Sequence, residues 1–253
     1  MLIKVEDFFR PIQFDDQLAK EEYDKLEPYL NIAKSWSELT YQSIYLVDYY
    51  RKCFLYVSNN PLFLCGKTAE QVMQDGYLFY LKNVPEDDLQ LLLRINEAGF
   101  SFIKIVPKAD RLKYFISYDF HLKQPDGNLT LINHKLMPLV LDKHSNPWIA
   151  SCLVSLSPST KSGNVRFCSK ELNKFFEFNL ETNQWTKFKR ITLNEREKSI
   201  LMYSVQGLTM DKIASKIFVS VDTVKFHKKN LFHKLNVKTI TEATAKAIDL
   251  ALL

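Results

Sequence analysis

The spacing of apolar and polar residues divides the chain into a mixed N-terminal part and a purely helical C-terminal part. Residues 43–60 predict two short strands on either side of the polar turn Tyr49–Lys52. Residues 114–141 alternate apolar and polar positions around Pro125–Gly127, which predicts a hairpin. Residues 148–158 then add one apolar strand. The N-terminal part therefore contains several antiparallel strands.

Helical signals lie before and between these strands. Thr68 can begin a short helix that ends near Gly76, and Pro85 followed by acidic residues begins a longer amphipathic one. An earlier packing helix is predicted over residues 18–35, with these residues on one face: Leu26, Tyr29, Leu30 and Ala33. The order of elements predicts an α+β domain, an antiparallel sheet with helices on one face.

From residue 191 onward the periodicity is that of a helix throughout. Asn194 and Glu197 have the spacing of a capping box, and Thr209 and Ser220 can each begin a further helix. Two short helices across a tight turn, the second rich in cations, form the helix-turn-helix pattern. We therefore expect an all-α, four-helix domain at residues 191–253.

The third of these helices sorts its residues onto two opposite faces. At about 100° per residue, one stripe is apolar and predicted to be buried: Val224, Leu231 and Leu235. The opposite face carries Lys225, Phe226 and Lys229. An aromatic ring on that face adds nothing to the domain core, but in a DNA groove it could pack on thymine methyls while the lysines reach guanines or phosphates. The alternative is an exposed phenylalanine on a solvated basic helix.

Charge supports the first interpretation. Residues 186–253 contain 13 basic and 6 acidic residues, a net charge of +7, whereas residues 1–185 have 21 basic and 23 acidic residues, a net charge of −2. The excess of positive charge therefore belongs to the C-terminal module, which suggests that this module meets a polyanion.

The motifs LNEREKSIL and QGLTMDKIASKIFVSVDTVKFHKKNLFHKL resemble the LuxR/NarL (GerE-type) DNA-binding domain over its full length. The resemblance departs at Ile240, where the family usually carries Arg. It implies base contacts by Lys225, Phe226 and Lys229. It assigns phosphate contacts to these residues: Thr209, Thr223, Lys228 and Lys234. His227 is either another phosphate donor or a buttressing residue.

The last helix carries two apolar faces, more than one small domain can bury. One face is Ala243, Ala247, Leu250 and Ala251, which we expect in the domain core. The other is Ala245, Ile248 and Leu252, which we predict to pair with a second copy across a twofold axis. The alternative is packing of this chain end against the rest of the protein.

Residues 41–158 resemble a PAS domain, in the run LFLCGKTAEQVMQDG and in the long hairpin with its terminal strand. PAS domains are sensor and dimerisation modules whose cavity holds haem, flavin, a small metabolite or nothing. The cofactor is therefore unknown, and a small-molecule ligand in the cavity is a candidate. Residues 1–40 would be an N-terminal helical extension, and residues 159–190 a linker that could pair as a hairpin.

Three other functional readings depend on few residues. Trp36 and Tyr41 have the spacing found in acyl-homoserine-lactone receptors, a quorum-sensing alternative. A receiver domain would need a phosphoacceptor, and Asp15–Asp16 and Asp48 lack its companions in order. Haem ligation could involve a histidine, but structural or exposed roles are favoured for all three candidates: His121, His134 and His144.

No P-loop, GxSxG, HExxH or paired-carboxylate pattern occurs, so we expect neither an enzyme nor a metal site. The four cysteines form no CxxC pair, and no apolar run is long enough to span a membrane, which favours the cytoplasm. The sequence thus predicts a dimeric, sequence-specific transcription regulator with a PAS-like sensor of a ligand or partner. Its expected partners are double-stranded DNA and a second copy, with RNA polymerase a candidate. The alternative is a PAS cofactor or ligand sensor acting through protein–protein contacts.

Overall fold

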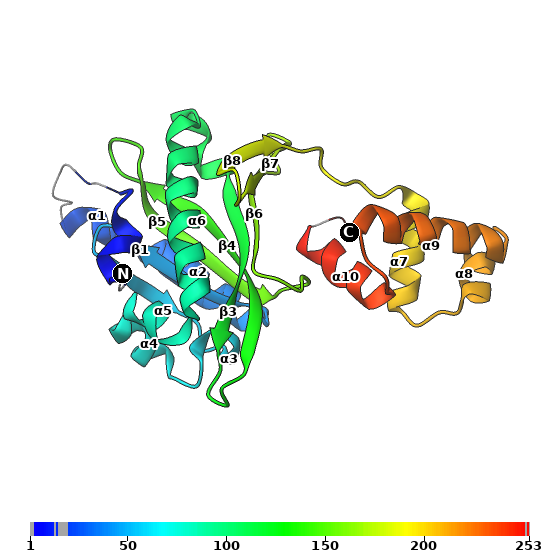
Figure 1. The fold of residues 1–253 in the computed structure, drawn as a ribbon, viewed down its shortest axis with the longest axis horizontal. Helices are drawn as coiled ribbons and strands as arrows, with labels where there is room; N and C mark the ends of the chain where they lie inside the picture. Colours follow the sequence, from blue (N-terminus) through cyan, green and yellow to red (C-terminus); the bar gives the residue numbers. More distant parts are fainter. Residues whose placement is uncertain (1–2, 13, 15–19, 251, 253) are drawn as a thin grey trace. The chain divides into compact units, whose positions relative to one another are not determined.

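The computed structural model describes residues 3–12, 14, 20–250 and 252 (Figure 1). It divides into two compact units, Met1–Phe188 and Lys189–Leu253, which are described separately. The division falls close to the start of the predicted helix-turn-helix domain at residue 191.

The first unit is built on one eight-stranded antiparallel sheet with the order β2-β1-β5-β4-β3-β6-β7-β8. Its strands are β1 (Ser43–Asp48), β2 (Cys53–Val57), β3 (Phe115–Lys123), β4 (Leu129–Leu141), β5 (Pro147–Leu156), β6 (Gly163–Ser169), β7 (Lys174–Asn179) and β8 (Gln184–Lys187). The predicted strands and the hairpin at Pro125–Gly127 are confirmed. Buried Asp48 holds the first turn by accepting hydrogen bonds from the Tyr50 and Arg51 amides at 2.9 and 3.0 Å, which is a structural role.

The segment predicted as a linker, residues 159–190, is largely part of this sheet. Strand β6 pairs with β3, β7 with β6 and β8 with β7. The short polar stretch before residue 163 therefore connects β5 to β6 within one sheet, in which β4 and β3 lie between them, and is not a domain boundary. The first unit extends to Phe188, and only a few residues separate β8 from the first helix of the second unit.

Helices cover both faces of the sheet rather than one. The helical segments are η1 (Val5–Phe9), α1 (Lys20–Asp24), α2 (Glu27–Leu39), α3 (Pro61–Leu64), α4 (Ala69–Asp75), α5 (Leu78–Asn83), α6 (Glu86–Ile105) and η2 (Lys108–Lys113). Side chains alternate between the faces of a strand. Tyr45 and Val47 of β1 lie in the main core with α4–α6, whereas Ile44 and Leu46 pack in a separate cluster with Ala33 of α2. Helices α4–α6 of the domain predicted at residues 41–158 thus share one face, as expected, and α2, from the predicted N-terminal extension, covers the other.

The second unit contains the four predicted helices, α7 (Glu195–Val205), α8 (Met210–Lys216), α9 (Val221–Leu235) and α10 (Ile240–Asp249). Each begins at a side-chain cap: Asn194, Thr209, Ser220 and Thr239. Such caps satisfy amide groups that have no partner within the helix. The predicted helix starts at Asn194, Thr209 and Ser220 are therefore confirmed.

One part of the core was not predicted from the sequence, and one predicted site lies outside the described residues. Phe8 and Phe9 of η1 are buried in the main core, which the sequence did not predict. Asp15–Asp16, considered as a phosphoacceptor pair, lie outside the described residues. Within the described part of the chain, no helix has the length and apolar character needed to cross a membrane.

Candidate nucleic-acid interface and sensor cavity

Helix α9 is held in place by an apolar stripe, as its spacing predicts. Val224, Leu231 and Leu235 are all fully buried. Val224 packs with Ile200 of α7 and Ile213 of α8, so the start of α9 is fixed against the other two helices. Burial of a side chain of this size stabilises the fold by about 1.5–3 kcal/mol. The opposite face of α9 is therefore presented at a defined angle.

That opposite face carries the three residues predicted to read bases. Lys225, Phe226 and Lys229 are all exposed, and 60% of the Phe226 surface is open to solvent. The Lys225 ammonium lies 3.0 Å from the Asp222 carboxylate, an exposed pair that costs little to separate. The structure thus brings the predicted residues together on one uncovered face, whose role in reading bases stays a prediction.

Two of the predicted phosphate contacts lie at helix N-termini. The Thr209 hydroxyl accepts a hydrogen bond from the Lys212 amide at 3.4 Å. The Thr223 hydroxyl lies 2.8 Å from the Ser220 hydroxyl, which itself caps α9. Helix N-termini favour anions because their free amides and dipole are positive. Both threonines are therefore placed where a phosphate could be bound.

Lys234, also predicted to contact phosphate, has a supporting contact within the module. Its ammonium lies 2.8 Å from the carboxylate of Glu197, which is almost fully buried. The same carboxylate accepts a hydrogen bond from the Asn194 amide at 2.9 Å. Lys234 therefore compensates a buried charge and joins the end of α9 to the start of α7, a role that the sequence did not indicate.

The other two predicted phosphate contacts are half-buried. The Lys228 ammonium lies 5.6 Å from the centre of the Phe232 ring. The Nδ1 atom of His227 is buried and has no hydrogen-bond partner among the described residues, while its ring lies edge-on to Phe226 at 5.5 Å. This position fits the buttressing alternative for His227, because the ring supports Phe226 from the side.

Sequence reasoning missed two residues beside this surface. Phe218, in the turn before α9, is 92% exposed and has a φ of 56°, a left-handed conformation that a bulky residue rarely adopts. Arg196 donates a hydrogen bond to the carbonyl of Ile217 at 2.6 Å and so fixes the same turn. The sequence contained a signal for Phe218. Like Phe226, it is a phenylalanine of the motif that the helical pattern does not place in the core.

The apolar faces of α10 differ in part from the prediction. Ala243 and Ala247 are fully buried, as expected. Leu252 is also buried in the core of the module, where its amide bonds to the Ala247 carbonyl at 2.9 Å, so it is not on an open dimer face. Ala245 and Ile248 remain exposed, and their role in dimerisation stays a prediction.

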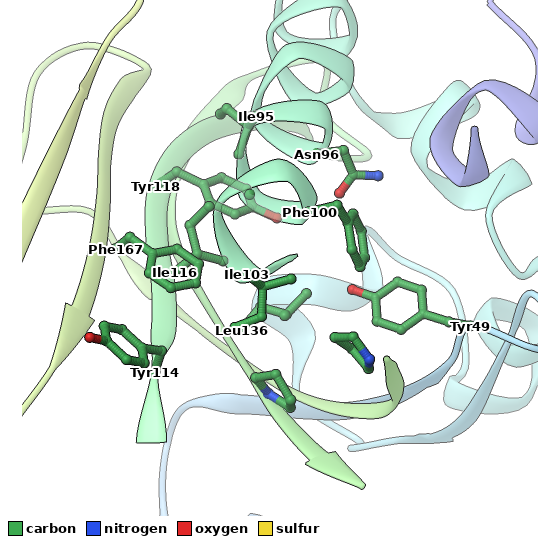
Figure 2. A pocket seen from close by; sticks show the side chains of 13 residues that line it. Tyr49, Ile95, Asn96, Phe100, Ile103, Tyr114, Ile116, Tyr118, Leu136 and Phe167 are labelled. Atoms are coloured by element: carbon green, nitrogen blue, oxygen red, sulfur yellow. The ribbon is translucent and has the colours of Figure 1, made fainter. Parts of the chain in front are cut away.

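The first unit contains two adjoining small cavities beneath α6. The larger has a volume of about 40 Å³ and is shown in Figure 2. The smaller has a volume of about 20 Å³. These residues line both: Tyr49, Asn96, Tyr118 and Leu136. Because one water molecule occupies about 30 Å³ in the liquid, neither cavity accommodates haem or flavin without rearrangement.

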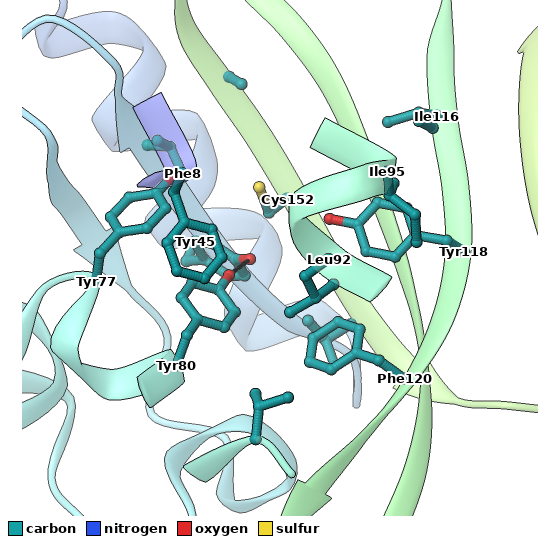
Figure 3. Packing of buried hydrophobic residues seen from close by; sticks show 14 of the residues in the cluster. Phe8, Tyr45, Tyr77, Tyr80, Leu92, Ile95, Ile116, Tyr118, Phe120 and Cys152 are labelled. Atoms are coloured by element: carbon teal, nitrogen blue, oxygen red, sulfur yellow. Dashed lines mark hydrogen bonds between the residues drawn. The ribbon is translucent and has the colours of Figure 1, made fainter. Parts of the chain in front are cut away.

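The smaller cavity is bordered by a buried hydrogen-bonded cluster, of which Figure 3 shows Tyr45, Tyr80 and the neighbouring Cys152. The Tyr45 hydroxyl bonds to the Tyr80 hydroxyl, and it lies 2.5 Å from Nε2 of His134. The Nδ1 atom of His134 is buried without a hydrogen-bond partner among the described residues. The neighbouring Cys152 thiol is fully buried.

Burial keeps all of these groups uncharged at neutral pH. It lowers the pKa of His134 to about 3, since the imidazolium would lose its hydration. Burial likewise raises the pKa values of Tyr45, Tyr80 and the Cys152 thiol. The cavity is therefore apolar with neutral polar groups.

Apart from His134, the residues considered for haem ligation or a lactone site lie away from the two cavities. His121 bonds through its amide and Nδ1 to Asp88 of α6, at 2.6 and 2.7 Å, and His144 lies in an exposed turn. Trp36 and Tyr41, which suggested a lactone receptor, are exposed and line neither of the two cavities. Of the three histidines, His134 is the one that lines either of the two cavities described above.

Comparison with known proteins identifies the C-terminal module. Residues 192–247 match the family model GerE, described as bacterial regulatory proteins of the luxR family. The Fimbriae Z protein of Escherichia coli K12 is 38% identical over 81 residues, which cover 32% of this chain and 37% of that protein. The nitrate/nitrite response regulator protein NarP of the same organism is 46% identical over 52 residues, covering 21% of this chain and 24% of NarP. The matches thus span little more than a third of these relatives at most.

Two solved structures align with this chain at low scores. A Vibrio cholerae VqmA dimer without its target DNA aligns over 93% of this chain and 89% of its own, at 14% identity and a TM-score of 0.30. A PAS domain from Colwellia psychrerythraea aligns over 53% of this chain and 98% of its own, at 13% identity and a TM-score of 0.36. At these scores the likeness carries no weight for function.

Proposed function

Because its C-terminal module is a LuxR-type helix-turn-helix domain, we propose that this protein is a cytoplasmic transcription regulator that reads DNA with α9 and senses a small molecule with its PAS-like domain. The observation that carries the proposal is the exposed edge formed by Lys225, Phe226 and Lys229, opposite a fully buried stripe. An aromatic ring between two cations suits a groove that offers thymine methyls, guanine edges and phosphates.

The proposal includes a twofold arrangement on DNA. A helix such as α9 covers only a few base pairs, so two copies would enter successive major grooves about one helical turn apart. Thr209, the cap of α8, and Thr223, in the first turn of α9, would hold phosphates and fix the register. Affinity would fall steeply with salt because lysine–phosphate contacts release counterions.

Two substitutions on α9 test the proposal directly. Lys225→Ala together with Lys229→Ala should lower affinity for a selected site about 100-fold and weaken the preference for that site over random DNA, since each good base contact contributes about 1–3 kcal/mol. Fluorescence anisotropy with both DNAs measures this. Lys198→Ala together with Lys246→Ala removes the same charge from α7 and α10 and should leave the ratio of affinities unchanged. An equal loss on both DNAs for the α9 variant would mean that the two lysines contact only phosphates.

For the sensor domain we infer a small, uncharged ligand with one or two hydrogen-bonding groups. The lining offers neutral tyrosines, Asn96 and the open Nδ1 of His134, and no charged residue lines either cavity. A charged ligand would lose its hydration there without gaining a partner. Mass spectrometry of compounds released from purified protein would identify such a ligand, and a released anion or cation would contradict this part of the proposal.

Helix α6 contacts both the cavity and β8, the last strand before the second unit. Ile95, Asn96 and Ile103 of α6 line the larger cavity. On the same helix, Phe102 packs against Phe167 of β6 at 4.4 Å and Trp185 of β8 at 4.9 Å. Because a ligand larger than the cavity must displace the side chains that line it, it would shift α6 and with it the last strand before the second unit.

A further inference from the structure

Helix α2 exposes an apolar stripe that the described residues of its own domain leave uncovered. The stripe consists of Tyr29, Ile32, Trp36 and Leu39, whose exposed fractions are 37, 54, 64 and 83%. Tyr41, just beyond the helix, is 94% exposed. Large apolar side chains grouped in this way on a soluble protein usually mark an interaction site.

The helix that carries the stripe is firmly held. Ala33 is buried against Ile44 and Leu46 of β1. The Ser37 hydroxyl lies 2.6 Å from the Tyr56 hydroxyl of β2, which fixes the second half of the helix to the sheet. The stripe is therefore presented on a rigid support, so that little conformational entropy is lost when it is covered.

The stripe also excludes charge. At about 100° per residue, its four members fall within a sector of about 80°. The charged residues of α2, Glu27, Lys34 and Glu38, lie on the opposite side of the wheel. A stripe without cations is poorly suited to DNA or an acidic membrane surface, both of which attract basic residues. It suits an apolar protein surface.

We propose that the occupant of this stripe is the α2 stripe of a second copy, packed antiparallel across a twofold axis. The members are separated by three, four and three residues, so the spacing is the same read in either direction. An antiparallel pairing centred between Ile32 and Trp36 sets Ile32 against the partner's Trp36 and Tyr29 against the partner's Leu39. An isologous interface requires this self-complementarity.

The available area agrees with a dimer of ordinary size. The four residues of the stripe and Tyr41 together expose on the order of 700 Å² of solvent-accessible surface per protomer, close to the roughly 800 Å² that each partner buries in a standard interface. By comparison, α10 offers only Ala245 and Ile248. The pairing itself does not depend on the proposed function. The proposed function only explains why a dimer is useful, because two α9 helices are needed to read a twofold DNA site.

Sedimentation velocity of the full chain without DNA tests this pairing. The wild type should sediment as a dimer, and Trp36→Glu or Ile32→Lys should raise the dimer dissociation constant about 100-fold or more, because each places two charges in an apolar contact. Ile105→Glu is the matched control, since Ile105 is an exposed apolar residue of α6 outside the stripe. A dimer that survives both substitutions, or a wild type that stays monomeric, would overturn the proposal.

Mixing the two variants tests the antiparallel register itself. A chain with Ile32→Lys and a chain with Trp36→Glu place a cation opposite an anion in the mixed pair and keep one native Ile32–Trp36 contact. The mixture should therefore form heterodimers under conditions where each variant alone is monomeric. Failure of the mixture to associate would contradict this register. Failure of the proposed function would instead appear as absence of DNA binding by a protein that still forms dimers.

Discussion

The two units of this protein use aromatic residues in opposite ways. Apart from the exposed rings on and beside α2, the first unit buries many of its aromatic rings, among them Tyr45, Phe63, Phe79 and Phe120, which are fully enclosed. The buried apolar residues described in the second unit are all aliphatic, and two of its phenylalanines, Phe218 and Phe226, lie on the surface. The difference lies in where each unit places its rings: the first encloses small cavities with many of them, and the second exposes two at its surface.

The groups around the rings differ in the same sense. Neutral hydroxyls and an uncharged imidazole surround the buried tyrosines, so the cavity favours a neutral ligand. Lysines flank the exposed Phe226, which favours a polyanion. On α2, the exposed Trp36 has neither hydroxyl network nor cation beside it on the stripe, which favours another apolar surface. The neighbours of an aromatic ring thus distinguish three kinds of site within one chain.

The largest predicted effect concerns the buried charge of the second unit. Lys234→Met keeps the length of the side chain but leaves the Glu197 carboxylate without its cation, and we expect a loss of about 2–3 kcal/mol in the free energy of unfolding. Chemical denaturation measures it. Lys229→Met, on the exposed edge of α9, is the control and should leave stability within about 0.5 kcal/mol. If the Lys234 variant is as stable as the wild type, Lys234 does not compensate the Glu197 charge, and phosphate binding is the only role left for it.

The next effect tests the neutrality of the cavity. His134 has a pKa of about 3 in the folded protein against 6.5 as its ordinary value. Between these values the unfolded chain binds a proton that the folded chain does not, so stability falls as pH falls. From pH 6.5 to 4.5 the loss should be about 2 kcal/mol. Chemical denaturation of the wild type and of His134→Phe over this pH range isolates the contribution of His134, because the contributions of other groups cancel. If the free energies of unfolding of the two proteins change in parallel with pH, His134 is not buried in its neutral form.

A smaller effect separates Phe226 from the lysines beside it. Phe226→Ala should weaken discrimination at thymine positions of the selected site by about 1 kcal/mol, because a methyl contact is lost. The dependence of affinity on salt should not change, since no phosphate contact is removed. Binding to sites with thymine or uracil at the same positions measures the methyl contact. A changed salt dependence would contradict a purely apolar role.

The smallest effect concerns Phe218. Its φ of 56° is costly for a bulky residue, so Phe218→Gly should raise stability by about 0.5–1 kcal/mol. If the exposed ring touches DNA, affinity should fall in the same variant. Thermal unfolding and anisotropy together show whether stability and binding move in opposite directions. A variant that loses stability would show that the ring supports the turn.

Local chemistry made much of this fold predictable. The hairpin at Pro125–Gly127, the caps at Asn194, Thr209 and Ser220, and the buried stripe of α9 depend on residues close in sequence, and the structure has them where the pattern predicts. The face presented by α9 could be worked out from helical geometry alone. These features depend on turn residues, caps and periodicity, which one sequence contains.

Features that depend on distant residues were not predictable in the same way. Residues 159–190 were expected to be a linker that could pair as a hairpin, and β7 and β8 do form that hairpin. Their place in the main sheet was missed, because the pairing of β6 with β3 joins segments that are far apart in the chain. Lys234 was assigned to phosphate because its partner Glu197 is 37 residues away. The position of α2 on the second face of the sheet, the burial of Leu252 and the cavity around His134 also depend on packing that no local pattern reveals.

Selection of binding sites from random DNA tests the central claim most directly. The full chain, incubated with random duplexes at low salt, should enrich a pseudo-palindrome whose two halves lie about one helical turn apart. The variant with Lys225→Ala and Lys229→Ala should enrich no such sequence. Recovery of no preferred sequence by the wild type, or of the same palindrome by the variant, would contradict DNA reading by α9.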